Sequence, residues 1–115
     1  MEKNQLREDS VDFAIAVSDV CDCIKGCSVF VNQLVRASSS IGANIHEAQY
    51  AQGTKDFISK FEIALKEASE TGYWLELLYR TSYIDEPTFK ILSSKCTSLR
   101  VMLIASCKTA KENNK

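Results

Sequence analysis

Apolar side chains recur at steps of three and four residues along most of the chain, which is the spacing of one face of an α-helix. Four such stretches are separated by turn-forming residues. The sequence therefore predicts four helices, near residues 8–26, 29–51, 54–82 and 86–112. The third stretch keeps an unbroken alternation of four- and three-residue steps from Phe57 to Ser82. This seam is typical of helices that pack side by side in a bundle.

Residues that favour helix starts support these boundaries. Ser28 and Thr54 are expected to cap the second and third helices. Asp85 with Pro87 marks the start of the fourth. The connections are short, so consecutive helices are expected to be antiparallel neighbours. We therefore predict an all-α fold, an up-down-up-down four-helix bundle that forms a single domain over residues 1–115.

Charged side chains on the second and third helices give a predicted register between them. If the hairpin turns near Gly53, Arg36 lies level with Glu70, and Glu47 lies near Lys60. We predict an ion pair between Arg36 and Glu70 in which both groups are partly desolvated. Such a pair sets the register and the choice of partner helix more reliably than it adds stability.

Polar side chains on the second helix are expected to complete this ion pair. Ser40 and Asn44 are the predicted hydrogen-bonding partners. The predicted structural network comprises Arg36, Ser40, Asn44, Glu47 and Glu70. An alternative interpretation takes Glu67 and Glu70 as paired catalytic carboxylates, but the sequence shows no sign of a cleft beside them.

The second helix is poor in charge, since residues 27–53 hold one basic and one acidic side chain. It also contains a run of small residues, which lets another backbone approach closely. That approach is either tight packing inside the chain or a helix contact between subunits. Residues 101–105 on the fourth helix are apolar on every side of the helix. The core of one bundle can bury only one side of a helix, so this stretch favours self-association. The predicted interface comprises Ser38, Ser39, Gly42, Val101, Met102 and Ile104.

Charge is distributed unevenly along a nearly neutral chain. The net charge is -1, but residues 1–26 hold three basic and six acidic side chains (-3), and residues 83–115 hold six and three (+3). Near-neutrality argues against a chain built throughout as a polycation for nucleic acid. Four lysines share one face of the fourth helix, namely Lys90, Lys108, Lys111 and Lys115. They are either contacts for RNA or solvated side chains that complement the helix dipole.

Composition excludes several other classes of protein. The 115 residues are 45% hydrophobic and 25% charged, with one proline and four glycines, too few turn residues for an all-β chain. The first residues do not resemble a secretory signal, and no apolar run reaches the roughly 18 residues of a membrane span. Five cysteines in such a chain favour free thiols and a cytoplasmic location.

Residue types that carry catalysis or bind metals lack the necessary spacing here. His46 is the only histidine, and no second one follows four residues later, as the helix of a zinc protease requires. Cys21 and Cys23 point about 200° apart on a helix. With Cys27 they do not form the C-x2-C pair of structural zinc sites. We therefore predict no catalytic residue, no metal or cofactor, and no small-molecule substrate.

Two long motifs resemble a known protein family. They occupy residues 33–48 (QLVRASSSIGANIHEA) and residues 55–57 with 63–75 (KDF and IALKEASETGYWL). Over about residues 11–110, the chain is similar to the four-helix-bundle family of proteins encoded in intervening sequences of bacterial 23S ribosomal RNA genes. The resemblance implies a closed left-handed bundle, a homopentameric ring and no enzymatic activity. Similar proteins that accompany diversity-generating retroelements engage nucleic acid and a reverse transcriptase through a basic ring surface.

Two functional hypotheses follow from the residues and the resemblance together. The first is a non-catalytic, ring-forming protein that associates with RNA or a ribonucleoprotein through its basic fourth helix. The alternative is an oligomeric scaffold that binds proteins and has no affinity for nucleic acid. Binding of structured RNA that weakens as salt rises would distinguish the first from the second.

Overall fold

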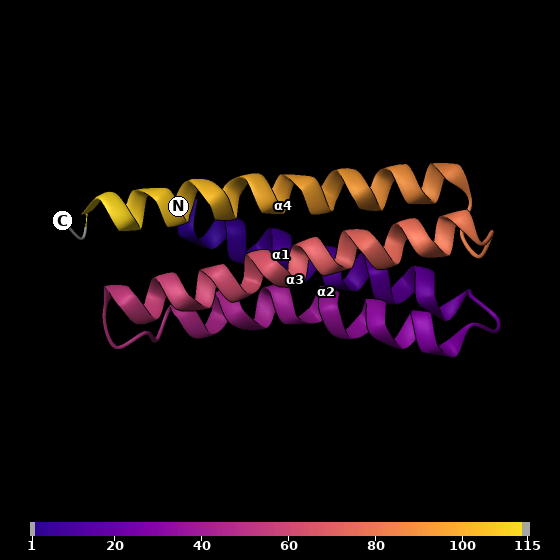
Figure 1. The fold of residues 1–115 in the computed structure, drawn as a ribbon, viewed down its shortest axis with the longest axis horizontal. Helices are drawn as coiled ribbons and strands as arrows, with labels where there is room; N and C mark the ends of the chain where they lie inside the picture. Colours follow the sequence, from indigo (N-terminus) through magenta and orange to yellow (C-terminus); the bar gives the residue numbers. More distant parts are fainter. Residues whose placement is uncertain (1, 114–115) are drawn as a thin grey trace.

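The structure, a computed structural model, describes the backbone of residues 2–113 and the side chains of residues 5–113. It contains four helices, α1 (Glu2–Asp22), α2 (Ser28–Ala48), α3 (Thr54–Arg80) and α4 (Glu86–Asn113). The helices lie side by side in a bundle of 48 × 21 × 21 Å, and each runs opposite to the one before it (Figure 1). The all-α bundle is thereby confirmed, while its left-handed twist stays a prediction.

Each helix packs against two neighbours. α1 contacts α2 and α4, and α3 contacts the same two helices, so the four surround one shared core. The stripes of apolar residues expected from three- and four-residue steps point into this core. Its largest fully buried apolar side chains are Phe13, Val17, Leu34, Ile41, Ile45, Leu75, Leu78, Leu92, Leu99 and Leu103. Each such side chain stabilises the fold by about 1.5–3 kcal/mol relative to an exposed one.

α1 begins and ends earlier than the sequence predicts. It starts at Glu2, because Leu6 extends the buried stripe two turns before Phe13. The residues around Leu6 are mostly polar, so the apolar spacing did not predict a helix there. It ends at Asp22. Gly26 and Cys27 follow with φ angles of 87° and 52°, a left-handed backbone that cannot continue the helix.

α2 and α3 also end before their expected boundaries. α2 ends at Ala48, and the chain forms a turn over residues 49–50. α3 ends at Arg80, two residues short of Ser82, whose φ of 69° lies in the left-handed region.

One of the three expected helix caps is formed. The Thr88 backbone N–H donates to Asp85 Oδ1 at 2.9 Å, so Asp85 caps α4 as predicted. The expected caps at Ser28 and Thr54 are wrong, because each is the first residue inside its helix. The residue before each one occupies the cap position and makes no side-chain hydrogen bond.

Candidate interaction surfaces

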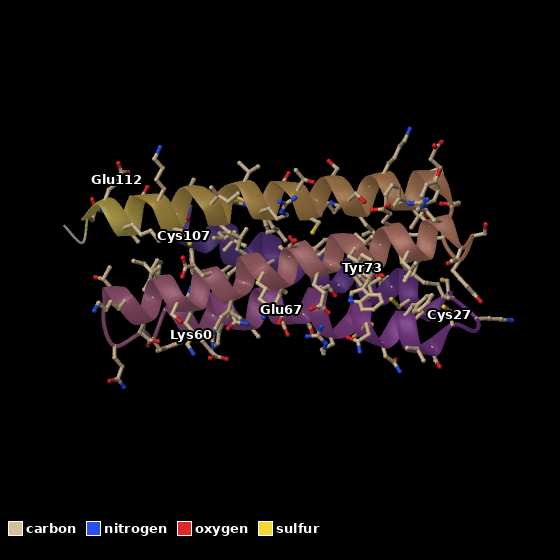
Figure 2. The ribbon with its side chains drawn as sticks, in the orientation of Figure 1. Cys27, Lys60, Glu67, Tyr73, Cys107 and Glu112 are labelled. Carbon is tan, nitrogen blue, oxygen red and sulfur yellow. The ribbon has the colours of Figure 1, made fainter. Side chains whose placement is uncertain are left out.

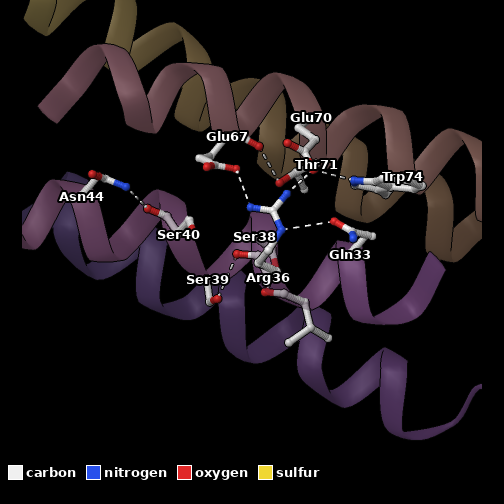
Figure 3. A network of polar contacts seen from close by, with 11 residues as sticks. Gln33, Arg36, Ser38, Ser39, Ser40, Asn44, Glu67, Glu70, Thr71 and Trp74 are labelled. Carbon is white, nitrogen blue, oxygen red and sulfur yellow. Dashed lines mark hydrogen bonds and ion pairs between the residues drawn. The ribbon is translucent and has the colours of Figure 1, made fainter. Parts of the chain in front are cut away.

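Arg36 on α2 reaches across to α3 and contacts two carboxylates there (Figure 3). One guanidinium nitrogen pairs with Glu70, and another lies 3.3 Å from Glu67 Oε1. Arg36 Nε donates to Gln33 Oε1 at 3.1 Å. Trp74 Nε1 donates to Glu70 Oε2 at 2.9 Å. We call these five residues the arginine cluster, and it joins the two helices at the level that the sequence register predicts.

Hydrogen bonds shift the ionisation of the arginine cluster. The indole N–H of Trp74, followed by the Arg36 guanidinium, lowers the pKa of Glu70 below its ordinary value. The hydrogen bond to Glu70 raises the pKa of Arg36 in turn. The Arg36 side chain is 46% exposed, and Glu67 is 17% exposed. Both shifts favour the charged forms of Arg36 and Glu70, but the pair is only partly desolvated, so water screens much of its attraction.

Ser40 and Asn44 lie outside the arginine cluster, so their expected part in completing the ion pair is wrong. Asn44 Nδ2 donates to the backbone carbonyl of Ser40 at 2.9 Å, which keeps both residues bonded along α2 (Figure 3). The sequence did not point to Gln33 or Trp74, whose longer side chains reach the charged groups instead. The available signal was their spacing, since each lies three or four residues from a member of the predicted pair.

Glu47 forms a separate contact between α2 and α3. Its Oε1 atom lies 3.4 Å from Lys60 Nζ. This pair is the second one that the register places face to face, and it lies apart from the arginine cluster. Glu47 is 57% exposed, so the pair marks the alignment of the helices and contributes little stability.

Two of the small residues on α2, Ser38 and Gly42, pack inside the chain. Ser38 is buried, and its hydroxyl donates to the Val35 carbonyl at 3.3 Å, so its predicted place in a subunit interface is wrong. A Cβ atom at Gly42 would lie 3.1 Å from Ser10 Oγ, which shows how closely α1 and α2 approach. Ser39 is exposed at the rim of this contact.

Three cysteines are buried, namely Cys21, Cys96 and Cys107. Burial raises the pKa of the Cys96 thiol to about 11, so this group stays protonated. Cys107 and Cys27 lie toward opposite ends of the bundle (Figure 2). Across residues 5–113, no three His, Cys, Asp or Glu side chains are grouped in a way that could hold a metal ion.

Two shallow surface grooves, each of about 400 Å³, run between neighbouring helices. The first lies between α1 and α2, and its lining includes Val11, Ile15, Gly42 and His46. The second lies between α3 and α4, and its lining includes Leu65, Ile104, Cys107 and Lys108. Neither groove is lined by Glu67 or Glu70, so neither supports the interpretation of these residues as catalytic carboxylates.

The apolar stretch of α4 divides between core and surface. Val101 is 60% exposed and Ile104 is 49% exposed, on the side that faces away from the core. Met102 is half-buried and packs against the core, so it is less available to a partner than the sequence suggested. Val101 and Ile104 remain the members of the predicted interface that α4 offers to solvent.

The lysines of α4 are only partly available to an anion. Lys111 Nζ lies 2.9 Å from Glu62 Oε2, and this hydrogen bond raises the pKa of Lys111. Lys90 Nζ lies 4.0 Å from Glu86 Oε1. Lys108 is exposed. The fourth lysine of the predicted stripe, Lys115, lies outside the described residues.

Between residues 2 and 113, none of the helices combines the length and apolar character that crossing a lipid bilayer requires.

Comparison with known proteins supports the fold independently. A protein from Bacteroides thetaiotaomicron VPI-5482, with a crystal structure at 1.70 Å resolution, shares 40% sequence identity with this chain. That protein is described as belonging to the S23 ribosomal protein family and as having unknown function. The match covers 94% of this chain and 99% of that chain, with a TM-score of 0.89. No curated protein matches. Residues 2–105 match the model of the 23S rRNA-intervening sequence protein family, and the chain belongs to that family.

Proposed function

We propose that this protein is a non-enzymatic member of its family that assembles with copies of itself into an oligomeric scaffold. Exposed apolar side chains on the outward sides of α1 and α4 are the observation that carries the proposal. The four involved are Val11, Ile15, Val101 and Ile104. Val11 and Ile15 lie one turn apart on α1, and Val101 and Ile104 lie one turn apart on α4, so each helix exposes a small apolar patch. Exposed apolar patches on a packed bundle mark surfaces that another protein covers. The family resemblance favours a ring of five copies.

The arginine cluster favours a structural role over a catalytic one. The Glu70 carboxylate already accepts hydrogen bonds from Arg36 and Trp74. These bonds lower its pKa, whereas a general acid needs a raised pKa near the working pH. The cluster therefore supports the alignment of α2 with α3 inside each copy. The free cysteines favour assembly in the cytoplasm.

Association with RNA or a ribonucleoprotein is the second candidate function. Lys90 and Lys108 are both exposed and share one line along α4, which favours contact with a phosphate backbone. Opposing this, the whole chain has a net charge of -1, and two of the described stripe lysines already contact acids. Fluorescence polarisation with a structured RNA at two salt concentrations tests it: binding that weakens with salt supports this function, and no binding at low salt overturns it.

Sedimentation velocity of the wild-type protein and of the variant Val101→Ser/Ile104→Ser tests the scaffold proposal. We expect the wild type to sediment as an oligomer and the variant to shift toward the monomer, while circular dichroism shows that both stay folded. Two monomeric proteins would overturn the proposal. A matched control, Val29→Ser, removes an apolar side chain that is 68% exposed near the start of α2.

A further inference from the structure

α1 differs from the other helices in how it is held to the bundle. Across the side chains of residues 5–113, those of α1 form hydrogen bonds and ion pairs only within their own helix. The other neighbouring helices are joined by polar contacts as well. The arginine cluster and the pair of Glu47 with Lys60 join α2 to α3, and the pair of Glu62 with Lys111 joins α3 to α4. Packing is therefore what keeps α1 in place.

That packing is also the least extensive in the bundle. One narrow stripe of α1 is buried, namely Leu6, Ser10, Phe13, Val17 and Cys21. At the closest approach to α2 the contact is made by small groups, the Ser10 side chain and the backbone of Gly42. The contact between α1 and α4 is the smallest of the four between neighbouring helices. Separating α1 from the bundle therefore exposes less apolar surface than separating α3 would.

The last turn of α1 carries charges that disfavour a helix. Asp19 and Asp22 both lie in this turn, and it holds no basic side chain. The C-terminal end of a helix bears a partial negative charge, which repels carboxylates. By contrast, α3 and α4 carry Arg80 and Lys111 in their last turns, where a positive charge is favourable.

We infer that α1 opens as a unit while α2, α3 and α4 stay packed, and that Asp19 and Asp22 favour this opening. Among the side chains of residues 5–113, no hydrogen bond or ion pair between helices has to break for α1 to leave. Its departure uncovers the apolar sides of α2 and α4 against which it packs. α1 is thus a movable lid over one side of the core, and such elements are drawn from the least stable part of a fold.

Amide hydrogen exchange of the wild-type protein tests this opening. Residues 10–20 of α1 should exchange at least about tenfold faster than residues 64–75 of α3, after correction for intrinsic rates, and by a similar factor along their length. Equal protection of the two segments would overturn the inference. A middle of α1 as protected as α3, with fast exchange confined to the ends, would also overturn it, because that pattern is fraying.

Two buried cysteines report the same opening from their side chains. Cys21 lies on the inner side of α1, whereas Cys96 lies between α3 and α4, where its Sγ donates to the Ala68 carbonyl at 3.3 Å. Iodoacetamide should modify Cys21 at least about tenfold faster than Cys96, as read by mass spectrometry. Low concentrations of urea should accelerate the reaction of Cys96 steeply and that of Cys21 only slightly, because partial opening exposes less surface than unfolding does. Equal rates with equal urea dependence would overturn the inference.

Removing the carboxylates at the end of α1 tests their part in the opening. Asp19→Asn/Asp22→Asn should slow amide exchange in α1 by about threefold, because the last turn loses its electrostatic repulsion. The matched control, Glu8→Gln/Asp12→Asn, removes the same charge from exposed positions more than one turn from that end and should not slow exchange. Circular dichroism verifies that both variants are folded. Equal slowing in the two variants, or no slowing in the first, would overturn the part assigned to Asp19 and Asp22.

Discussion

Trp74 Nε1 donates a 2.9 Å hydrogen bond to Oε2 of Glu70, one turn earlier on α3. The same oxygen pairs with the guanidinium of Arg36 on α2. The indole and the guanidinium thus hold the Glu70 carboxylate between them, at the contact of α3 with α2. Phe30 lies beside the indole, with ring centroids 6.0 Å apart, and helps to hold it in place.

Glu70→Gln should lower stability at neutral pH and lose that effect in acid. The pKa of Glu70 lies below its ordinary value of 4.5, so the folded state favours the ionised form more than the unfolded chain does. The stabilisation is complete above about pH 4.5 and disappears as the pH falls through the lower, folded-state pKa. Because the pair is partly solvated, we expect a loss of about 1 kcal/mol at pH 7.

Thermal unfolding followed by circular dichroism measures this difference. At pH 7 the variant should melt about 4 °C below the wild type. At pH 3 the two melting temperatures should move together, because protonation removes the charge from wild-type Glu70. A gap of the same size at both pH values would show that the ionised carboxylate is not the source of the stability.

Trp74→Phe should raise the pKa of Glu70 toward 4.5. The indole hydrogen bond is the largest cause of the lowered pKa, and phenylalanine keeps an aromatic ring beside Phe30 while removing the donor. A carboxyl-carbon NMR titration of Glu70 in the two proteins measures the shift. An unchanged pKa would mean that Arg36 alone holds the carboxylate in its ionised form.

Gly42→Ala and Gly72→Ala should affect stability differently, although both replace a glycine inside a helix. A Cβ atom at Gly72 meets nothing within 4 Å, so alanine should stabilise the protein by about 0.5–1 kcal/mol. At Gly42 the new Cβ would lie 3.1 Å from Ser10 Oγ, so this gain should be reduced or lost. Adding Ser10→Ala should recover part of it. Equal melting temperatures for the two single variants would contradict the close approach of α1 and α2.

The cysteines should differ in reactivity according to burial. Cys96 is 3% exposed, and burial raises its pKa to about 11, while Cys23 is exposed. Iodoacetamide at pH 8, followed by mass spectrometry, should therefore modify Cys23 quickly and Cys96 only after unfolding. Modification of Cys96 in the native protein at the rate of Cys23 would contradict the core packing around it.

Much of the fold could be predicted from the sequence because helical periodicity encodes it directly. Leu75 and Leu78 stand at predicted steps of the third-helix stripe, and both are fully buried. Asp85 caps α4 through a local contact that the sequence makes visible. Arg36 meets Glu70 because a short hairpin leaves little freedom in how two helices align. These features depend on where residues stand along the chain, and the spacing of apolar and charged residues in the sequence shows that directly.

The remaining features depend on which neighbour a side chain meets, and spacing does not report that. A run of small residues indicates a close approach, yet only the bundle shows that Gly42 lies against Ser10 of α1 and that Ser38 is buried. The hydrogen bond from Trp74 depends on the direction of its side chain. The start of α1 at Glu2 could not be predicted from apolar spacing, because its first turns carry few apolar residues.

The molecular mass of the wild-type protein in solution tests self-assembly most directly. Light scattering coupled to size-exclusion chromatography, repeated over a range of protein concentrations, gives that mass without a variant or a ligand. We predict one main species whose mass is a multiple of the 12.9 kDa chain. A mass of 12.9 kDa at every concentration would contradict the account, because the apolar side chains on the outside of α1 and α4 would then stay in water.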